Sequence, residues 1–225
     1  MKKAHSLKNM RVMTATALFC ALAFACTALI KIPVQFLTLD LKDSLIILCS
    51  LLFGPASGLS VAVVVPLLEF VSISGTGVYG LIMNVLSSVT FAAMTGFIYH
   101  RKKSMTGAVI GLVSGVFAVT AVMVLANLFI TPYYLGTTTA VVASLIPKML
   151  LPFNLIKAVL NAAIVLLLYK PLSRILKKIG FIQASNRPTP TAEEIRRSRL
   201  RTVAVSAIAV AVIAASLLVI FLVLR

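Results

Sequence analysis

Acidic and catalytic residues are scarce in this chain of 225 residues, which has 21 lysines and arginines but only 5 acids and 2 histidines. We expect no two of the acids to lie near each other within the apolar runs, which excludes an intramembrane acidic relay. The sequence contains no phosphate-binding loop, no G-x-S-x-G and no H-E-x-x-H motif. The chain is therefore predicted to be neither an ATPase nor any other enzyme.

Cysteine is also rare, and its positions argue against metal chemistry. Cys20, Cys26 and Cys49 all lie within apolar runs, and no C-x-x-C spacing is present. Small buried hydrophobic side chains are the expected role of such cysteines. The sequence predicts no metal site.

Hydrophobic residues dominate what is present. They make up 60% of the chain, and the mean hydropathy is +1.09, whereas ordinary soluble domains are about 45–50% apolar. Only helices and closed barrels satisfy their backbone polar groups in lipid, and these apolar runs are too long for barrel strands. The predicted fold class is all-α, a polytopic membrane protein.

The formal charge of +16 comes from clusters that flank the apolar runs. The clusters lie at Met1–Arg11, His100–Lys103, Lys170–Lys178 and Arg196–Arg201. Short basic segments beside membrane spans mark the cytoplasmic side and are not a nucleic-acid footprint. The predicted location is the cell membrane, with several crossings and a cytoplasmic N-terminus.

The segment Asp43–Val71 has two interpretations, and the basic clusters decide between them. As one helix, its roughly 29 residues would be about 43 Å long, against a hydrocarbon core of about 30 Å. Two helices, Ser44–Phe53 and Ala56–Phe70, place the later basic clusters on the same side as the N-terminus. The sequence thus predicts a break at Gly54-Pro55, with Asp43 as a candidate N-cap.

These boundaries predict three parts: a six-helix membrane domain over residues 1–179, a cytoplasmic linker over 180–198 and an additional transmembrane helix over 199–225. Val34–Leu41 reads as a short strand between the first two helices. The other expected helices are Val12–Ile30, Val78–Tyr99, Thr106–Ile130 and Leu145–Lys170.

The helix Leu145–Lys170 carries Asn154, Lys157 and Asn161 within roughly 60° of one face. A lysine inside such a segment costs about 2.5–3.5 kcal/mol, which a partner, water or ligand normally offsets. Lys157 either extends outward to the interface or contributes to a polar binding face. Glu69 is the one acid deep enough to pair with it, although its place near the helix end favours a solvated glutamate.

Other polar residues occur at a similar depth. Asn84 and Asn127 lie in the outer parts of their helices, where each forms either an interhelical hydrogen bond or part of a pocket. Asp40 is either a solvated loop charge or the rim of that pocket. Tyr133 and Tyr134 serve either as interfacial anchors or as a stacking surface. Together these residues favour a binding pocket over an active site.

Ala17, Ala21 and Ala25 form a ridge of small residues on the first helix. Such a ridge lets another helix approach closely. The residues alone favour packing against another helix of this chain over docking to a partner.

With these residues in view, the chain resembles the riboflavin-specific substrate-binding (S) components of energy-coupling factor (ECF) transporters. The resemblance covers about residues 10–178 and rests on the segments FLTLDLKDSL, LLFGPASGL, TGVYGLIMN, NLFITPYY and PFNLIKAVLN. It implies a six-helix bundle that captures riboflavin outside and releases it inside. The implied partners are a transmembrane coupling subunit and two ATPase subunits, and riboflavin is cargo rather than a cofactor.

The resemblance also assigns roles to residues. It implies that Asn154, Lys157 and Asn127 contact the flavin and that the first loop, around Leu39 and Asp40, closes over it. Asn84 completes the set of expected ligand-binding residues. The resemblance further implies that Ala17, Ala21 and Ala25 dock onto the coupling subunit.

Two alternative functions remain open at this point. One is an S component for another small vitamin, with the same architecture and different pocket contacts. The other is a solitary vitamin facilitator that needs no ATPase. The resemblance gives no role to the additional transmembrane helix predicted over residues 199–225, which is the seventh hydrophobic segment of the chain.

Overall fold

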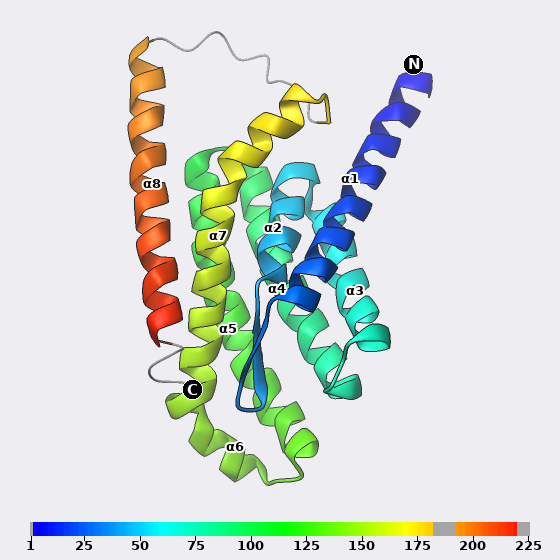
Figure 1. Ribbon diagram of the computed structural model, residues 1–225, viewed down its shortest axis with the longest axis vertical. Coiled ribbons are helices and arrows are strands. Elements are labelled where there is room, and N and C mark those ends of the chain that lie inside the picture. The colour runs from blue at the N-terminus through cyan, green and yellow to red at the C-terminus, as the bar shows by residue number, and fades with distance from the viewer. Residues whose placement is uncertain (1, 182–191, 220–225) are drawn as a thin grey trace.

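The computed structural model describes residues 2–181 and 192–219, which form a helical bundle with one small hairpin (Figure 1). Its elements are α1 (Lys2–Leu29), β1 (Lys31–Val34), β2 (Leu37–Asp40), α2 (Lys42–Phe53), α3 (Pro55–Ser72), α4 (Gly77–Arg101), α5 (Met105–Leu135), α6 (Thr139–Leu145), the π-helical turn η1 (Ile146–Leu150), α7 (Leu151–Lys178) and α8 (Ala192–Val219). Six described helical segments are long and apolar enough to cross a membrane. The predicted all-α polytopic fold is confirmed.

The predicted break between α2 and α3 is confirmed as well. Gly54 has a φ of 114°, a conformation that favours glycine, and Pro55 begins α3. The 12 residues of α2 extend only about 18 Å, which is too short to cross a bilayer. Because Ile46, Ile47, Leu48 and Cys49 are all fully buried, α2 acts as a central core helix, which the other helices surround.

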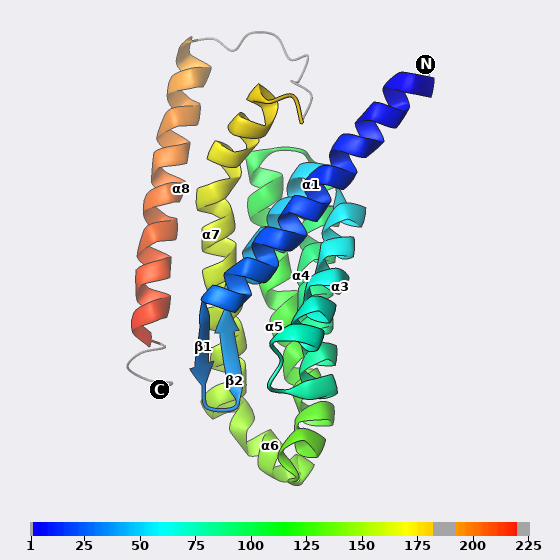
Figure 2. The ribbon, with the colours of Figure 1, turned by 45° about the vertical axis from the view of Figure 1, so that its right-hand side comes forward.

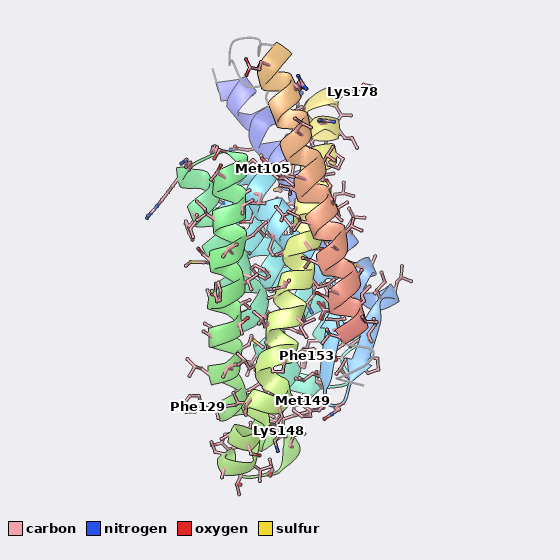
Figure 3. All side chains as sticks on the ribbon, turned by 90° about the vertical axis from the view of Figure 1, so that its left-hand side faces the viewer. Met105, Phe129, Lys148, Met149, Phe153 and Lys178 are labelled. Atoms are coloured by element: carbon pink, nitrogen blue, oxygen red, sulfur yellow. The ribbon has the colours of Figure 1, made fainter. Side chains whose placement is uncertain are left out.

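The long helices run up and down between two ends of the molecule. Met105 and Lys178 lie at one end, which we call the basic end, and Phe129 and Lys148 lie toward the other (Figure 3). The hairpin and α6 lie toward this second end, which we call the hairpin end (Figures 1 and 2). Two of the predicted basic clusters, around Arg101 and Lys178, therefore lie at the same end, as the charge pattern indicates.

Glycine and small side chains let the central helices approach closely. A Cβ atom on Gly111 of α5 would lie 2.8 Å from the carbonyl oxygen of Thr95 on α4. A Cβ atom on Gly96 of α4 would lie 2.1 Å from the hydroxyl of Ser50 on α2. The glycines thus fix the spacing between α2, α4 and α5 in the main apolar core.

The segment predicted as one strand is a hairpin of two strands. Lys31 pairs with Asp40, and Val34 pairs with Leu37 at the turn. Gln35 reverses the chain with a φ of 53°, a left-handed conformation that sequence patterns do not predict for this residue. The hairpin brings Asp40 back beside the start of the strand.

Several predicted boundaries were wrong. α5 continues through Pro132 to Leu135 and ends at Gly136, whose left-handed φ of 63° supplies the helix stop. The connection between the helices predicted at Thr106–Ile130 and Leu145–Lys170 contains α6, and α7 begins only after η1. α8 begins at Ala192, inside the predicted linker, because the charged residues there are good helix formers. The remaining linker residues, 182–191, lie outside the described part.

A second apolar cluster joins the hairpin to α7. It contains Val34 and Leu39 from the hairpin and Phe153 and Leu160 from α7, and Ile213 of α8 packs against it. We call the four buried residues Val34, Leu39, Phe153 and Leu160 the hairpin cluster. The cluster holds the hairpin against the helix that carries most of the predicted polar face.

Candidate functional site

A pocket opens at the hairpin end of the bundle. It encloses about 840 Å³ of space between atoms, a figure that includes the solvent at its open mouth. Its walls come from the hairpin and from the nearest turns of α3, α4, α5 and α7, represented by Glu69, Tyr79, Tyr134 and Phe153.

The pocket brings together most of the predicted site residues. Asn84, Asn127, Asn154, Lys157 and Asp40 all line it, although they come from four different elements. This juxtaposition depends on the folded bundle, since the residues are up to 117 positions apart in the chain.

The structure does not place Leu39 among the lining residues. Its side chain is buried in the hairpin cluster, because successive side chains in a strand point to opposite faces and Asp40 takes the pocket side. Phe36, at the turn of the hairpin, instead supplies the hairpin's aromatic side chain to the pocket.

Four charged side chains form a continuous chain beside the pocket, in which three are buried and Lys157 is half-buried. Lys157 Nζ lies 2.8 Å from Asp40 Oδ2, and Lys42 Nζ lies 3.4 Å from the same oxygen and 2.9 Å from Glu69 Oε2. We call Lys157, Asp40, Lys42 and Glu69 the ion chain. Its two cations and two anions balance, which is what buried charges require.

The ion chain corrects two expectations and decides between the two interpretations of Lys157. Glu69 is 4% exposed and paired with Lys42, so the prediction of a solvated glutamate was wrong. The prediction that no two acids lie near each other was also wrong, because Asp40 and Glu69 share Lys42. Lys157 points to Asp40 rather than outward to the interface. In each case the cause is the hairpin, which places Asp40 and the following Lys42 inside the bundle. The hydrophobic periodicity of the sequence does not predict this placement.

Asp40 is held as an anion by its neighbours. Burial alone would raise the pKa of this carboxyl group, but the positive charges of Lys157 and Lys42 outweigh burial and lower the pKa to about 2. The carboxylate thus stays ionised at neutral pH and ties β2 to α2 and α7.

Two carboxylate oxygens keep unused hydrogen-bonding capacity. Oδ1 of Asp40 and Oε1 of Glu69 are buried without a hydrogen-bond partner among the described residues, and both residues line the pocket. Buried acceptors in this state cost free energy. A hydroxyl or N–H group of a ligand would satisfy them once the side chains that cover these oxygens move aside.

Three of the predicted asparagines line the pocket, and Asn161 does not. Asn154 donates its amide to the carbonyl of Leu150 at 2.7 Å, which leaves its own oxygen available as an acceptor. Asn84 donates to Glu69 Oε2 at 3.3 Å, so it forms an interhelical hydrogen bond and lines the pocket at once. Asn127 donates to Met123 and accepts from Thr131.

Asn161, from the same predicted face, is fully buried and lies outside the pocket lining. Its oxygen accepts the backbone N–H of Ser44 at 2.8 Å, and its amide donates to the carbonyl of Asp40 at 3.2 Å. Asn161 therefore caps the start of α2. The prediction that Asp43 is the N-cap was wrong, because α2 already begins at Lys42 and the Asp43 carboxylate accepts from Ser88.

Aromatic rings line the mouth of the pocket. Tyr134 and Tyr79 meet edge to face with their ring centres 6.2 Å apart, and Phe36 and Phe153 also line the cavity. Tyr133, by contrast, is 76% exposed on the outside of α5. The structure thus separates the two neighbouring tyrosines into a pocket residue and a surface residue.

The alanine ridge faces away from the bundle. Ala17, Ala21 and Ala25 are all exposed, whereas the opposite side of α1 packs inward through Phe19 and Ala23. Internal packing is therefore not the role of the ridge in this structure, and its surface is accessible to another helix.

Lys42 is the member of the ion chain that the sequence analysis did not single out. Its side chain is 1% exposed. A usable signal was present: Asp40, Lys42 and Asp43 fall within four positions at the start of a mostly apolar helix.

No cluster of three or more potential metal-ligating side chains occurs in the described ranges 2–181 and 192–219.

Comparisons with known proteins agree with this architecture. Residues 11–169 match the family described as "ECF transporter, substrate-specific component". The chain is 32% identical over 188 residues to the riboflavin transporter RibU of Staphylococcus aureus (strain TCH60), with 79% of this chain and 98% of that protein covered. It is 27% identical over 150 residues to the riboflavin transporter FmnP of Bacillus subtilis (strain 168), with 60% and 76% covered.

A solved structure leads to the same family. The S component of a bacterial ECF transporter superposes on this chain with a TM-score of 0.64 at 31% identity, covering 75% of this chain and 98% of that one. Residues 11–169, which match the family, contain the hairpin, the ion chain and the pocket. The chain therefore belongs to the substrate-specific components of ECF transporters.

Proposed function

We propose that this chain is a riboflavin-binding S component, which captures riboflavin at the hairpin end and delivers it to the basic end. The observation that carries the proposal is the pocket, which combines aromatic walls with a row of polar groups. Two relatives named as riboflavin transporters support the choice of ligand.

The polar groups suit the two chemically different parts of riboflavin. The imide edge of the flavin ring offers an N–H donor between two carbonyl acceptors, which complements the Asn154 oxygen and the Lys157 ammonium. The sugar-alcohol chain offers several hydroxyl donors, which complement the unused oxygens of Asp40 and Glu69. Tyr79 and Tyr134 lie where they would contact the fused rings.

In this proposal the chain performs transport and not catalysis. The pocket's polar groups are occupied in ion pairs and amide hydrogen bonds, a geometry for holding a ligand rather than for moving protons. Riboflavin is the cargo, and the proposal includes no resident cofactor or metal.

The direction of transport follows from charge. We place the basic end in the cytoplasm, with the N-terminus, by the positive-inside rule. The pocket then faces outward. Release inside requires the ECF coupling subunit, which would dock on Ala17, Ala21 and Ala25, and two ATPase subunits that supply the energy. Residues 1–179 would form the transport domain, 180–198 the linker and 199–225 an additional membrane anchor.

The identity of the vitamin is testable by ligand-induced stabilisation. Thermal unfolding of the purified chain is measured with saturating riboflavin, thiamine or biotin, since a ligand that binds only the folded state raises the melting temperature. We expect a rise with riboflavin alone. A rise with another vitamin and none with riboflavin would replace riboflavin as the substrate while keeping the S-component assignment.

Glu69→Gln tests the assignment of the sugar-alcohol chain. A hydrogen bond to a charged group contributes about 1.5–3 kcal/mol, so we expect riboflavin affinity to fall by roughly tenfold or more. Lumiflavin, which has the ring system but no sugar alcohol, should lose little affinity. Both affinities are measured by fluorescence titration. An equal loss for the two ligands would mean that Glu69 supports the pocket only through Lys42 and does not accept from the hydroxyls.

A further inference from the structure

Helix α8 lies outside the region that matches the S-component family, which ends at residue 169. It nevertheless packs lengthwise beside α7, on a different side of the bundle from α1 (Figures 1 and 2). Few of its side chains are buried, and its outward face is apolar. Beyond acting as an anchor in lipid, α8 therefore supports the helix that carries the polar groups of the pocket.

One face of α8 meets the bundle. Thr202, Ala209, Ile213 and Ser216 are buried or half-buried at helical spacing, whereas Ile208 on another face is 63% exposed. The small side chains of Ala209 and Ser216 allow close approach to α7. The asymmetry shows that α8 has a defined rotational setting.

Both ends of this contact are specified by side chains. Toward the basic end, Lys170 of α7 donates a hydrogen bond to the hydroxyl of Thr202. Toward the hairpin end, Ile213 packs against the hairpin cluster. The register of α8 on α7 is thereby fixed on both sides of Ala209.

The contact of Ile213 links α8 to the pocket. The hairpin cluster contains Phe153, which lines the pocket next to Asn154, and also Val34 of β1. The hairpin itself is a two-stranded sheet, too small to be stable alone. The hairpin is held against the bundle by the ion chain on one side and by the hairpin cluster on the other.

We propose that α8 is an in-cis brace that holds the hairpin closed over the bound substrate and slows substrate release. The proposal rests on the proposed function. Besides its contacts along α7, α8 packs through Ile213 against the hairpin cluster. If this contact is made only when the hairpin lies against α7, it stabilises the closed state relative to the open one. Ile213 and Ala209 are accordingly positioning residues, because neither one lines the pocket.

A matched pair of substitutions tests the brace in the full-length chain. Ala209→Leu adds the same volume as Ala207→Leu, but Ala209 is 2% exposed and Ala207 faces outward. Overpacking at a buried site costs about 1–3 kcal/mol. We expect riboflavin to dissociate about fivefold faster from Ala209→Leu, measured by stopped-flow recovery of flavin fluorescence, and at the parental rate from Ala207→Leu.

A milder variant and a ligand-free readout complete the test. Ile213→Ala should speed dissociation in the same direction, and Ile208→Ala should not. Without ligand, hydrogen exchange of the amides in residues 31–40 should quicken in Ala209→Leu and Ile213→Ala only. Parental dissociation and exchange in both inward variants would overturn the brace. Quickened exchange in a chain that does not bind riboflavin would instead keep the brace and remove the proposed function.

Discussion

Replacing Lys157 with methionine is expected to weaken riboflavin binding by at least about a hundredfold. The ammonium group holds Asp40 at 2.8 Å and the carbonyl of Thr38 at 3.3 Å, so it fixes the hairpin to α7 while it lines the pocket. Removing one partner of a buried ion pair costs about 3–5 kcal/mol, and each 1.4 kcal/mol is a factor of ten. Equilibrium titration of flavin fluorescence measures the loss.

Two controls separate binding from folding in this prediction. Lys148→Met removes a lysine at the same end of the molecule, but this side chain is exposed (Figure 3), and its affinity should match that of the parent. The double variant with Asp40→Asn and Lys157→Met removes both charges of the pair, so the melting temperature should partly recover. Affinity that recovers together with the melting temperature would show that Lys157 supports the hairpin without contacting riboflavin.

Ala21→Leu is expected to abolish uptake while leaving binding unchanged. Ala21 lies in the middle of the exposed ridge on α1, and it lines no part of the pocket. A leucine there would keep a partner helix from approaching closely. Uptake is measured with labelled riboflavin in cells that supply the coupling and ATPase subunits, and affinity is measured on the purified variant.

The matched control for the ridge is Ala211→Leu, which places the same side chain on an exposed position of α8. Its uptake should equal that of the parent. Normal uptake by Ala21→Leu would contradict docking at the ridge and would favour a facilitator that works without partners. Loss of binding by Ala21→Leu would instead assign the ridge to the fold of α1.

The sequence sufficed for the architecture because membrane helices are specified locally. Length, apolar composition and the positions of basic residues predicted the crossings, and Gly54-Pro55 marked the break between α2 and α3. The family was also recognisable from short segments such as PFNLIKAVLN, and the family match confirms it. These signals need no knowledge of which helices are neighbours.

The ion chain was beyond local reasoning. The pairing of Lys157 with Asp40 joins residues 117 positions apart, and it depends on a turn at Gln35 that has an unusual backbone conformation for its residue type. Glu69 resembled an interfacial charge when considered alone. Its ion pair with Lys42, 27 positions away in the chain, offsets the free-energy cost of burying both charges.

The measurement that tests the central claim most directly is a titration of the purified full-length chain in detergent with riboflavin, followed by quenching of flavin fluorescence. We predict saturable quenching with one riboflavin bound per chain, and its loss in Lys157→Met and Asn154→Ala. A parent chain that unfolds cooperatively and yet leaves riboflavin fluorescence unchanged at every concentration would contradict the assignment of riboflavin to this pocket.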